Sequence, residues 1–188
     1  MVYCPPGNPC RYPASRQHQA ADKRGGIQAG SKETIKREDI MVSYECRKLD
    51  LTDAEMIMRM NQDFRKDFVT LDGIRNFLKK DENWMFAAVD GERIIGFVYG
   101  YELCRFDGKG TMLYLHEVGV MECFWRQGIG YGLFTELKNA CKAKNICKIF
   151  LATSQNNVAA NALYRKLNGE FSRESNGQDS CYYFPVMK

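Results

Sequence analysis

Apolar positions follow no regular spacing before about residue 40, and follow helical or alternating spacing after it. Residues 1–40 are instead rich in Pro, Gly, Gln, Lys and Arg, a composition that buries too little apolar surface to fold. We therefore predict a disordered or loosely attached extension over residues 1–40 and one folded domain over residues 41–188. The alternative for the first segment is an arm that packs on a neighbouring subunit.

The first half of the folded domain predicts one strand, two helices and a three-stranded meander. Thr52 to Glu55 has the form of a capping box, and the helix that follows would place Phe64 and Phe68 on its core face. A second helix is predicted after Asp72. Short turns join the last three strands, which indicates antiparallel pairing. The four predicted strands are residues 42–49, 84–89, 93–104 and 112–120.

The second half of the domain alternates helices and strands. Residues 130–144 and 157–167 have helical apolar spacing before and after the buried strand 148–153, and two closing strands follow at 170–174 and 180–186. A strand, helix, strand passage of this length forms a right-handed parallel crossover. The predicted fold class is therefore α/β of mixed type, with a largely antiparallel sheet of six to seven strands flanked by about four helices.

Net charge is concentrated in the extension. Of 27 Lys and Arg and 23 Asp and Glu, residues 1–40 hold seven and four, so the other 148 residues carry 20 basic and 19 acidic side chains. A nearly neutral domain lacks the basic surface that nucleic acids require, so we expect no nucleic-acid partner. No apolar run approaches the roughly 18 residues of a membrane-spanning helix, so we expect no membrane role.

Eight cysteines and two histidines are present, but no two cysteines form a C-x-x-C pair. The spacing therefore predicts neither a metal site nor a disulfide framework. Several cysteines lie inside apolar segments, where a thiol behaves as a small buried hydrophobe. This pattern is typical of a reducing compartment, and we predict a cytoplasmic protein.

The segment RQGIGY, residues 126–131, joins the strand 112–120 to the following helix. Its two glycines leave the backbone open to a ligand, and the first N–H groups of a helix have no partner within it. Unpaired donors and the positive end of the helix dipole both favour phosphate or pyrophosphate. A tight strand-to-helix turn without a ligand is the alternative that this segment alone leaves open.

This order of elements, with WRQGIG and the later NNVAANALYRKLNGEF, resembles the GNAT superfamily of acyl-CoA-dependent N-acetyltransferases over about residues 43–188. The resemblance implies acetyl-CoA as the cofactor, with its pyrophosphate on the glycine turn. It also implies that Val118 and Val120 hydrogen-bond the pantetheine arm through their backbone, and that Asn157 contacts the same arm. Trp125 departs from the family pattern, which usually has Arg or Gln at this position. The implied cofactor contacts of the turn itself are Arg126, Gln127, Gly128, Ile129, Gly130 and Tyr131.

A closer similarity relates the segments NFLKKDENWMFAAVDGERIIGF and LYLHEVGV to the small aminoglycoside 3-N-acetyltransferases of this superfamily, which have a carboxylate where Glu117 stands. The acceptor that this similarity implies is a small-molecule amine, polyamine-like or an aminoglycoside, and a homodimer is left open. Asp63, Asp67 and Glu102 could add negative charge for such a polycation.

Acetyl transfer to an amine needs a neutral nucleophile, a polarised thioester carbonyl and a proton for the departing thiolate. Glu117 is the predicted proton acceptor, with a structural ion pair to a Lys or Arg as the alternative. His116 would point to the opposite face of the strand unless a bulge intervenes. By the resemblance, Tyr164 lies near the sulfur and is the predicted proton donor, with a core tyrosine as the alternative. The N–H of Val118 could hold the oxyanion.

These assignments predict an acetyl-CoA-dependent N-acetyltransferase that moves the acetyl group to a primary amine by direct attack in a ternary complex. The alternative from another class is a non-catalytic CoA-binding regulatory or interaction module. A nucleotide-binding protein is a weaker alternative, because the turn lacks the Lys-Ser/Thr pair of a P-loop.

Overall fold

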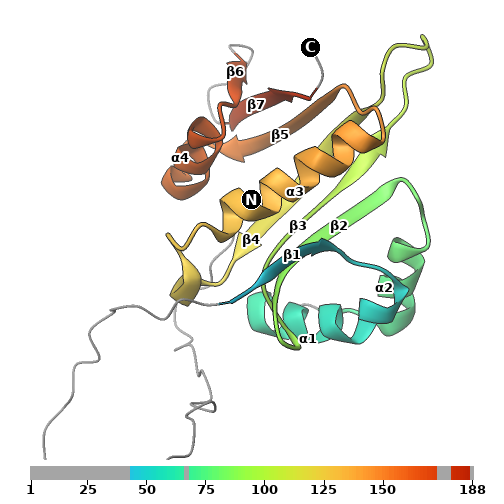
Figure 1. The fold of residues 1–188 in the computed structure, drawn as a ribbon, viewed down its shortest axis with the longest axis vertical. Helices are drawn as coiled ribbons and strands as arrows, with labels where there is room; N and C mark the ends of the chain where they lie inside the picture. Colours follow the sequence, from blue (N-terminus) through green and yellow to red (C-terminus); the bar gives the residue numbers. More distant parts are fainter. Residues whose placement is uncertain (1–42, 66–67, 173–178, 187–188) are drawn as a thin grey trace, which may run out of the picture.

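A computed structural model describes residues 43–65, 68–172 and 179–186, so the predicted extension lies outside the described residues. Seven strands of the described chain form one sheet in the order β1-β2-β3-β4-β5-β7-β6. All neighbours pair antiparallel except β4 and β5, which are parallel. Together with four α-helices, this sheet confirms the predicted mixed fold class (Figure 1).

The predicted helices and strands all occur, with ends that shift by a few residues. The strands are β1 (Glu45–Lys48), β2 (Asn83–Asp90), β3 (Arg93–Leu103), β4 (Met112–Val120), β5 (Lys148–Ser154), β6 (Glu170–Ser172) and β7 (Asp179–Pro185). The helices are α1 (Ala54–Phe64), α2 (Leu71–Leu78), α3 (Ile129–Ala143) and α4 (Val158–Lys166), with the short 3-10 turns η1 (Leu51–Asp53) and η2 (Glu122–Phe124).

Helices cover both faces of the sheet. Phe97 of β3 packs edge-on against Phe64 of α1, with ring centroids 5.0 Å apart. The neighbouring residue, Gly96, faces the other way, because a Cβ there would come within 2.8 Å of Ile129 in α3. Figure 1 shows α3 lying across the sheet and the α1 and α2 pair grouped near β1 and β2. The strands between these layers are therefore buried on both sides, which explains their nearly continuous apolar sequence.

α4 lies on the same face as α3. The ring of Phe184 in β7 contacts both Phe134 of α3 and Tyr164 of α4, with centroids 4.4 and 6.2 Å apart. Gly130 lets the two helices approach each other, because a Cβ there would lie 3.0 Å from Leu163 of α4. The glycine turn before α3 and the helix α4 are therefore held side by side.

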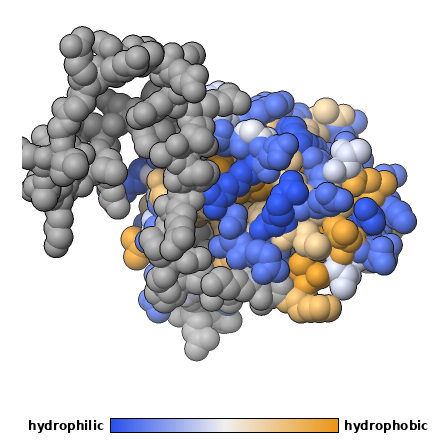
Figure 2. Space-filling model, turned by 90° about the horizontal axis from the view of Figure 1, so that it is seen from below, coloured by the Kyte–Doolittle hydropathy of each residue, from blue (hydrophilic) through white to orange (hydrophobic). Residues whose placement is uncertain are grey.

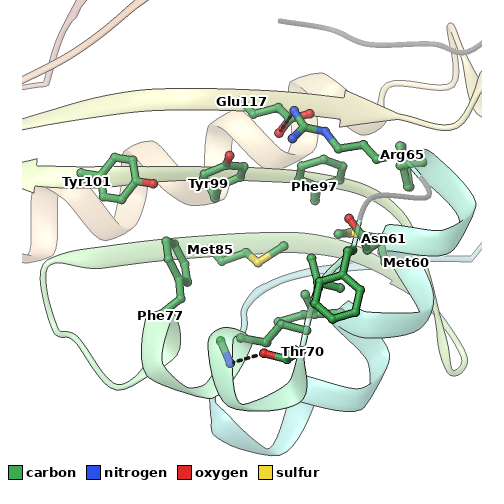
Figure 3. Close-up of a pocket in the computed structure, with 16 residues that line it drawn as sticks. Met60, Asn61, Arg65, Thr70, Phe77, Met85, Phe97, Tyr99, Tyr101 and Glu117 are labelled. Carbon is green, nitrogen blue, oxygen red and sulfur yellow. Dashed lines mark hydrogen bonds and ion pairs between the residues drawn. The ribbon is translucent and has the colours of Figure 1, made fainter.

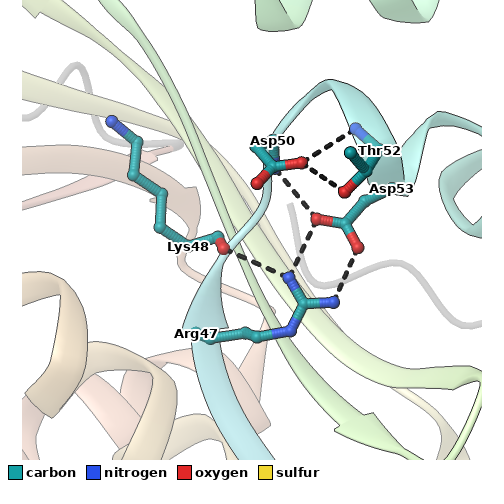
Figure 4. Close-up of polar contacts among 5 residues, drawn as sticks. All are labelled: Arg47, Lys48, Asp50, Thr52 and Asp53. Atoms are coloured by element: carbon teal, nitrogen blue, oxygen red, sulfur yellow. Dashed lines mark hydrogen bonds and ion pairs between the residues drawn. The ribbon is translucent and has the colours of Figure 1, made fainter.

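The chain enters α1 through η1 rather than through the predicted capping box. Asp50 accepts a hydrogen bond from the Thr52 N–H at 2.8 Å, and the Asp53 carboxylate accepts one from the Asp50 N–H at 2.9 Å. Arg47 of β1 pairs with Asp53 at 2.6 Å (Figure 4), and its hydrogen bond lowers the pKa of Asp53. The prediction of a box between Thr52 and Glu55 is wrong, because the capping box forms two residues earlier, between Asp50 and the buried Asp53.

The two phenylalanines predicted for the core face of α1 have different environments. Phe64 is buried, as predicted, but the side chain of Phe68 is 93% exposed. α1 ends at Phe64, so Phe68 no longer follows the helical spacing that would turn it inward. The core prediction for Phe68 is therefore wrong.

A β-bulge in β4 interrupts its pairing with β3. Tyr99 pairs with Glu117, but Gly100 pairs with Leu115, so His116 is the extra residue. The His116 ring centroid lies 5.2 Å from that of Tyr99, the residue opposite Glu117. His116 and Glu117 therefore share a face of the sheet. The opposite orientation expected of a regular strand does not apply here, because the bulge absorbs one residue.

Gly100 permits this bulge. A Cβ at this position would lie 2.1 Å from the carbonyl oxygen of Tyr114 and 3.1 Å from the Cα of Leu115. The two backbones approach too closely for any side chain, which is the usual reason for a glycine inside a strand.

Within the described ranges, no helix is both long and apolar enough to cross a bilayer. The six cysteines that the structure describes are free thiols. Burial raises the pKa of Cys46 to about 11 and that of Cys141 to about 12, so both remain protonated near neutral pH.

Candidate active site

The parallel pairing of β4 with β5 is short and leaves backbone groups of β4 without a strand partner. The pairing ends at Tyr114 and Phe150. Beyond that point the Met121 N–H donates to a carbonyl of β3 at 3.0 Å, and backbone groups alternate sides along a strand. The N–H and C=O groups of Val118 and Val120 therefore point away from β3, toward the unpaired edge.

Backbone donors gather in the turn between β4 and α3. Gly128 is the N-cap of α3, with a φ of 83° that glycine adopts without strain, and no side chain caps the helix. In the part of the chain that the structure describes, no acceptor pairs with the N–H groups from Gly128 to Tyr131. These donors and the helix dipole suit an anion such as a pyrophosphate.

The side chains of the turn have separate roles. Ile129 is buried against β3, so only its backbone is open to a ligand. Arg126, Gln127 and Tyr131 are exposed. Lys166 of α4 lies over the Tyr131 ring at 5.8 Å and adds a positive charge beside the turn. Sequence reasoning missed Lys166, because only the packing of α4 on α3 brings it to this place.

Trp125, the departure from the family pattern, closes the corner between β4 and the turn. Its indole N–H donates to the carbonyl of Val120 at 2.8 Å. The bond takes one acceptor position of Val120 and leaves the N–H of that residue available. The Trp125 side chain is therefore tied to the end of β4.

Two asparagines organise the start of α4. Asn157, predicted to contact the pantetheine arm, is the N-cap, and its Oδ1 accepts from the Ala160 N–H at 3.1 Å. Asn161 was not predicted; its amide donates to the carbonyls of Asn157 at 2.7 Å and Ser154 at 3.0 Å, and its Oδ1 accepts from the Tyr182 hydroxyl at 2.8 Å. Asn161 therefore ties the β5–α4 loop to β7. Its signal in the sequence was a second asparagine four residues after the N-cap.

Tyr164 combines features of both readings made from the sequence. Its side chain is 3% exposed, and its ring lies 5.3 Å from that of Tyr182, as expected of a core tyrosine. No hydrogen bond of its hydroxyl is present among the described residues. Burial, and to a lesser extent Tyr182, raises the pKa of Tyr164. The phenol therefore stays protonated at neutral pH and can donate a hydrogen bond.

A cavity of about 480 Å³ lies on the opposite face, between α1, α2 and the strands β2 to β4. This volume is within the usual range of small-molecule sites. Figure 3 shows Phe77, Tyr99 and Tyr101 along its wall, with Glu117 and Arg65 facing each other on the strand side. The cavity therefore meets β4 at the predicted proton acceptor.

Glu117 is the buried carboxylate of this cavity. It is 4% exposed, and its Oε2 lies 2.6 Å from Nη2 of Arg65, at the end of α1. The ion pair that the sequence left open as an alternative is present, but on a cavity wall rather than in a packed core. Burial, followed by the charge of Glu117, raises the pKa of Tyr99 to about 12. The Tyr99 hydroxyl therefore stays protonated beside the carboxylate.

Two of the other acidic residues predicted to attract a polycationic acceptor form ion pairs outside the cavity. Asp63 pairs with Arg93 at 3.2 Å, and Glu102 pairs with Lys144 at 2.6 Å. Asp67 lies outside the described residues. Neither described acid lines the cavity.

β4 brings the two halves of the site together. The glycine turn and Tyr164 belong to the face covered by α3 and α4, whereas Glu117 belongs to the face covered by α1 and α2. Val118, the next residue along β4, presents its backbone at the unpaired edge between them. This arrangement suits the transfer of a group from a ligand along the edge to a ligand in the cavity.

Comparison with known proteins relates this architecture to one family. A sequence model described as the Acetyltransferase (GNAT) family matches residues 44–169, which are 126 of the 188 residues. No curated protein matches the sequence significantly.

Similar solved structures include three acetyl-transfer proteins. NAA60 from Arabidopsis thaliana, in complex with acetyl-CoA, is 22% identical with a TM-score of 0.61, over 77% of this chain and 99% of that one. The aminoglycoside acetyltransferase meta-AAC0020 from an uncultured soil metagenomic sample, in complex with sisomicin, is 18% identical with a TM-score of 0.60, over 65% and 86%. The PaiA N-acetyltransferase from Thermoplasma acidophilum, in complex with coenzyme A, is 16% identical with a TM-score of 0.60, over 76% and 99%. At these identities the similarity establishes the fold alone.

Proposed function

Because this chain belongs to the acetyltransferase (GNAT) family, we propose that it moves an acetyl group to a primary amine of a small acceptor by direct attack in a ternary complex. Acetyl-CoA dependence comes with the family, so the chain is an acetyl-CoA-dependent N-acetyltransferase. The acceptor and the residue roles are the proposed part. The observation that carries them is Glu117, a buried carboxylate on a cavity wall and one residue from the unpaired edge of β4.

The glycine turn and β4 offer the donors that the cofactor needs. The N–H groups of the turn bind the pyrophosphate, and the edge at Val118 and Val120 hydrogen-bonds the pantetheine arm near Asn157. The unpaired donors at the start of α3 and the short pairing of β4 support this assignment. Acetyl-CoA supplies the activated thioester. The proposed contacts of the turn are Arg126, Gln127, Gly128, Ile129, Gly130 and Tyr131, with Ile129 acting through its backbone.

The residues on and near β4 then have complementary roles. Glu117 attracts the acceptor ammonium in place of Arg65 and accepts its proton, directly or through a water. The free amine attacks the thioester carbonyl, and the N–H of Val118 stabilises the negative charge on the carbonyl oxygen. Tyr164 donates its phenolic hydrogen to the thiolate that leaves. One amine proton thus moves to Glu117 and Tyr164 passes a proton to sulfur, while the second amine proton, released as the amide forms, restores the Tyr164 hydroxyl through water.

Tyr164→Phe tests the proposed donor. We expect kcat to fall about tenfold, which is less than the full contribution of a general acid. The loss is limited because a water molecule can still donate a hydrogen bond to the thiolate. The affinity for CoA and the free energy of unfolding should change little, since the ring packing is kept and the hydroxyl has no partner in the described chain. Steady-state thiol release and urea unfolding measure both effects. An unchanged kcat would assign Tyr164 to the core alone.

A screen of acceptors tests the proposed activity. The resemblance favours a polyamine-like molecule or an aminoglycoside, and Glu117 offers a carboxylate for one ammonium of any primary amine. Kanamycin- and gentamicin-type aminoglycosides, spermidine, simple amines and free peptides are offered with acetyl-CoA, and thiol release is recorded. Release with one amine class is expected. Complete silence, with CoA still bound, would favour a non-catalytic CoA-binding regulatory or interaction module.

Two predictions concern the setting of the reaction. A cytoplasmic location is supported by the free state of the six described cysteines. A homodimer is a prediction from the resemblance, and sedimentation of the purified chain measures it.

A further inference from the structure

The cavity beside Glu117 has apolar and aromatic walls. Ile57, Ile74 and Met85 line it, and Phe77 meets the rings of Tyr99 and Tyr101 edge-on at 5.8 and 6.0 Å. Seen from below the view of Figure 1, much of the described surface is hydrophilic, with smaller apolar areas between (Figure 2). The apolar lining of the cavity can therefore bury the body of a ligand.

The described lining of the cavity contains two charged side chains, which pair with each other. Among the described residues that line it, only Glu117 and Arg65 are charged, and they contact each other at 2.6 Å. The described part of the lining therefore has no net charge. Among the described lining residues, a second or third ammonium on the same ligand would meet hydrocarbon and aromatic rings and no further carboxylate, and burying an unpaired charge is costly.

Arg65 and an incoming ammonium would both pair with the carboxylate of Glu117. The side chain of Arg65 is 35% exposed and lies at the end of α1, whereas that of Glu117 is 4% exposed. The guanidinium can therefore return to water at a lower cost than the carboxylate. One ammonium can replace the Arg65 guanidinium, and Glu117 then still pairs with a single cation.

The rings next to Glu117 suit the same ligand. Tyr99 and Tyr101 lie 5.2 and 6.0 Å from the His116 ring that the bulge brings to this face. Aromatic faces attract a nearby ammonium and also bury an aromatic or alkyl group. Both parts of an amphipathic amine therefore have a partner.

We propose that the acceptor is an amphipathic monoamine, a primary amine on one aromatic or alkyl body. Its single ammonium lies at Glu117 and its body lies against Phe77 and Ile74. This inference rests on the proposed function and narrows its acceptor away from polyamines and aminoglycosides.

Acceptor competition provides the first test. The values of kcat/KM at saturating acetyl-CoA are measured for 2-phenylethylamine and hexylamine, and compared with those for spermidine and kanamycin. We expect the two monoamines to exceed both polycations by about tenfold or more, because the polycations leave charges unpaired. An equal or higher value for spermidine or kanamycin would overturn the inference.

Variants of α2 test where the preference arises. Ile74→Glu adds a carboxylate to the lining, and we expect it to shift the ratio of kcat/KM toward spermidine by about tenfold. Ile74→Gln removes the same apolar group without charge and should not raise that ratio. Asn76→Glu adds the charge on the exposed side of the same helix and should leave the ratio unchanged. Equal shifts in all three variants would contradict a role for the cavity.

Binding separates this inference from the proposed activity. Calorimetric titration of 2-phenylethylamine and of spermidine into the CoA-saturated full chain measures recognition without chemistry. Selective binding of 2-phenylethylamine without any thiol release would refute the proposed activity and support the cavity preference. Thiol release with no preference in binding or kcat/KM would support the proposed activity and refute the preference of the cavity for monoamines.

Discussion

Glu117→Gln should lower kcat by about 100-fold or more, while the dissociation constant of CoA stays within about twofold. The amide cannot accept the ammonium proton, but it keeps the size of the carboxylate and can still accept a hydrogen bond from Arg65. The cofactor donors lie in the turn before α3 and on the edge of β4, so the substitution leaves them in place. Steady-state thiol release gives kcat, and calorimetry gives the CoA affinity.

Glu102→Gln is the matched control for this prediction. It removes a carboxylate that also lies 2.6 Å from its cationic partner, Lys144, but outside the cavity. We expect its kcat to remain within about twofold of the parent, because no proton transfer depends on it. A large loss of CoA binding in Glu117→Gln would refute a role on the acceptor side. An unchanged kcat would leave the ion pair with Arg65 as the whole function of Glu117.

Gly100→Ala should lower the free energy of unfolding by about 2 to 3 kcal/mol and also reduce kcat. Its Cβ would lie 2.1 Å from the Tyr114 carbonyl oxygen, so the two strands must separate or the bulge must move. Either change displaces His116 and Glu117, which the bulge holds on one face. Urea unfolding measures the stability, and kcat is measured at a temperature where the variant stays folded.

Gly132→Ala is the control that separates the contact between position 100 and the Tyr114 carbonyl from the general effect of an added methyl group. Gly132 lies in α3, where alanine is favoured over glycine, and its Cβ would meet the movable side chain of Cys46 at 3.3 Å. We expect its unfolding free energy to change by less than about 1 kcal/mol and its kcat to stay unchanged. Equal stability of the Gly100 and Gly132 variants would mean that the bulge tolerates a side chain.

Local patterns predicted the elements well where the signal was strong. The bounds of β4 match the prediction, and those of α3 and β5 shift by one residue. Alternating or helical apolar spacing reports burial directly, so these long segments are readable without the fold. The first turn of α1 was misread, because Asp53 accepts from the Asp50 N–H and is held in place by Arg47 of β1. Phe68 was misplaced because the helix ends before it.

The sequence by itself determined the order of strands and helices, the glycine turn with its unpaired donors, and the carboxylate at Glu117. These follow from periodicity and from the chemistry of neighbouring residues, which act over short stretches of chain. Only the tertiary structure decided what surrounds that carboxylate. Arg65 reaches it from α1, His116 joins it through a bulge that Gly100 permits, and an apolar cavity closes around it. Such contacts depend on the register and packing of distant segments, which no local pattern specifies.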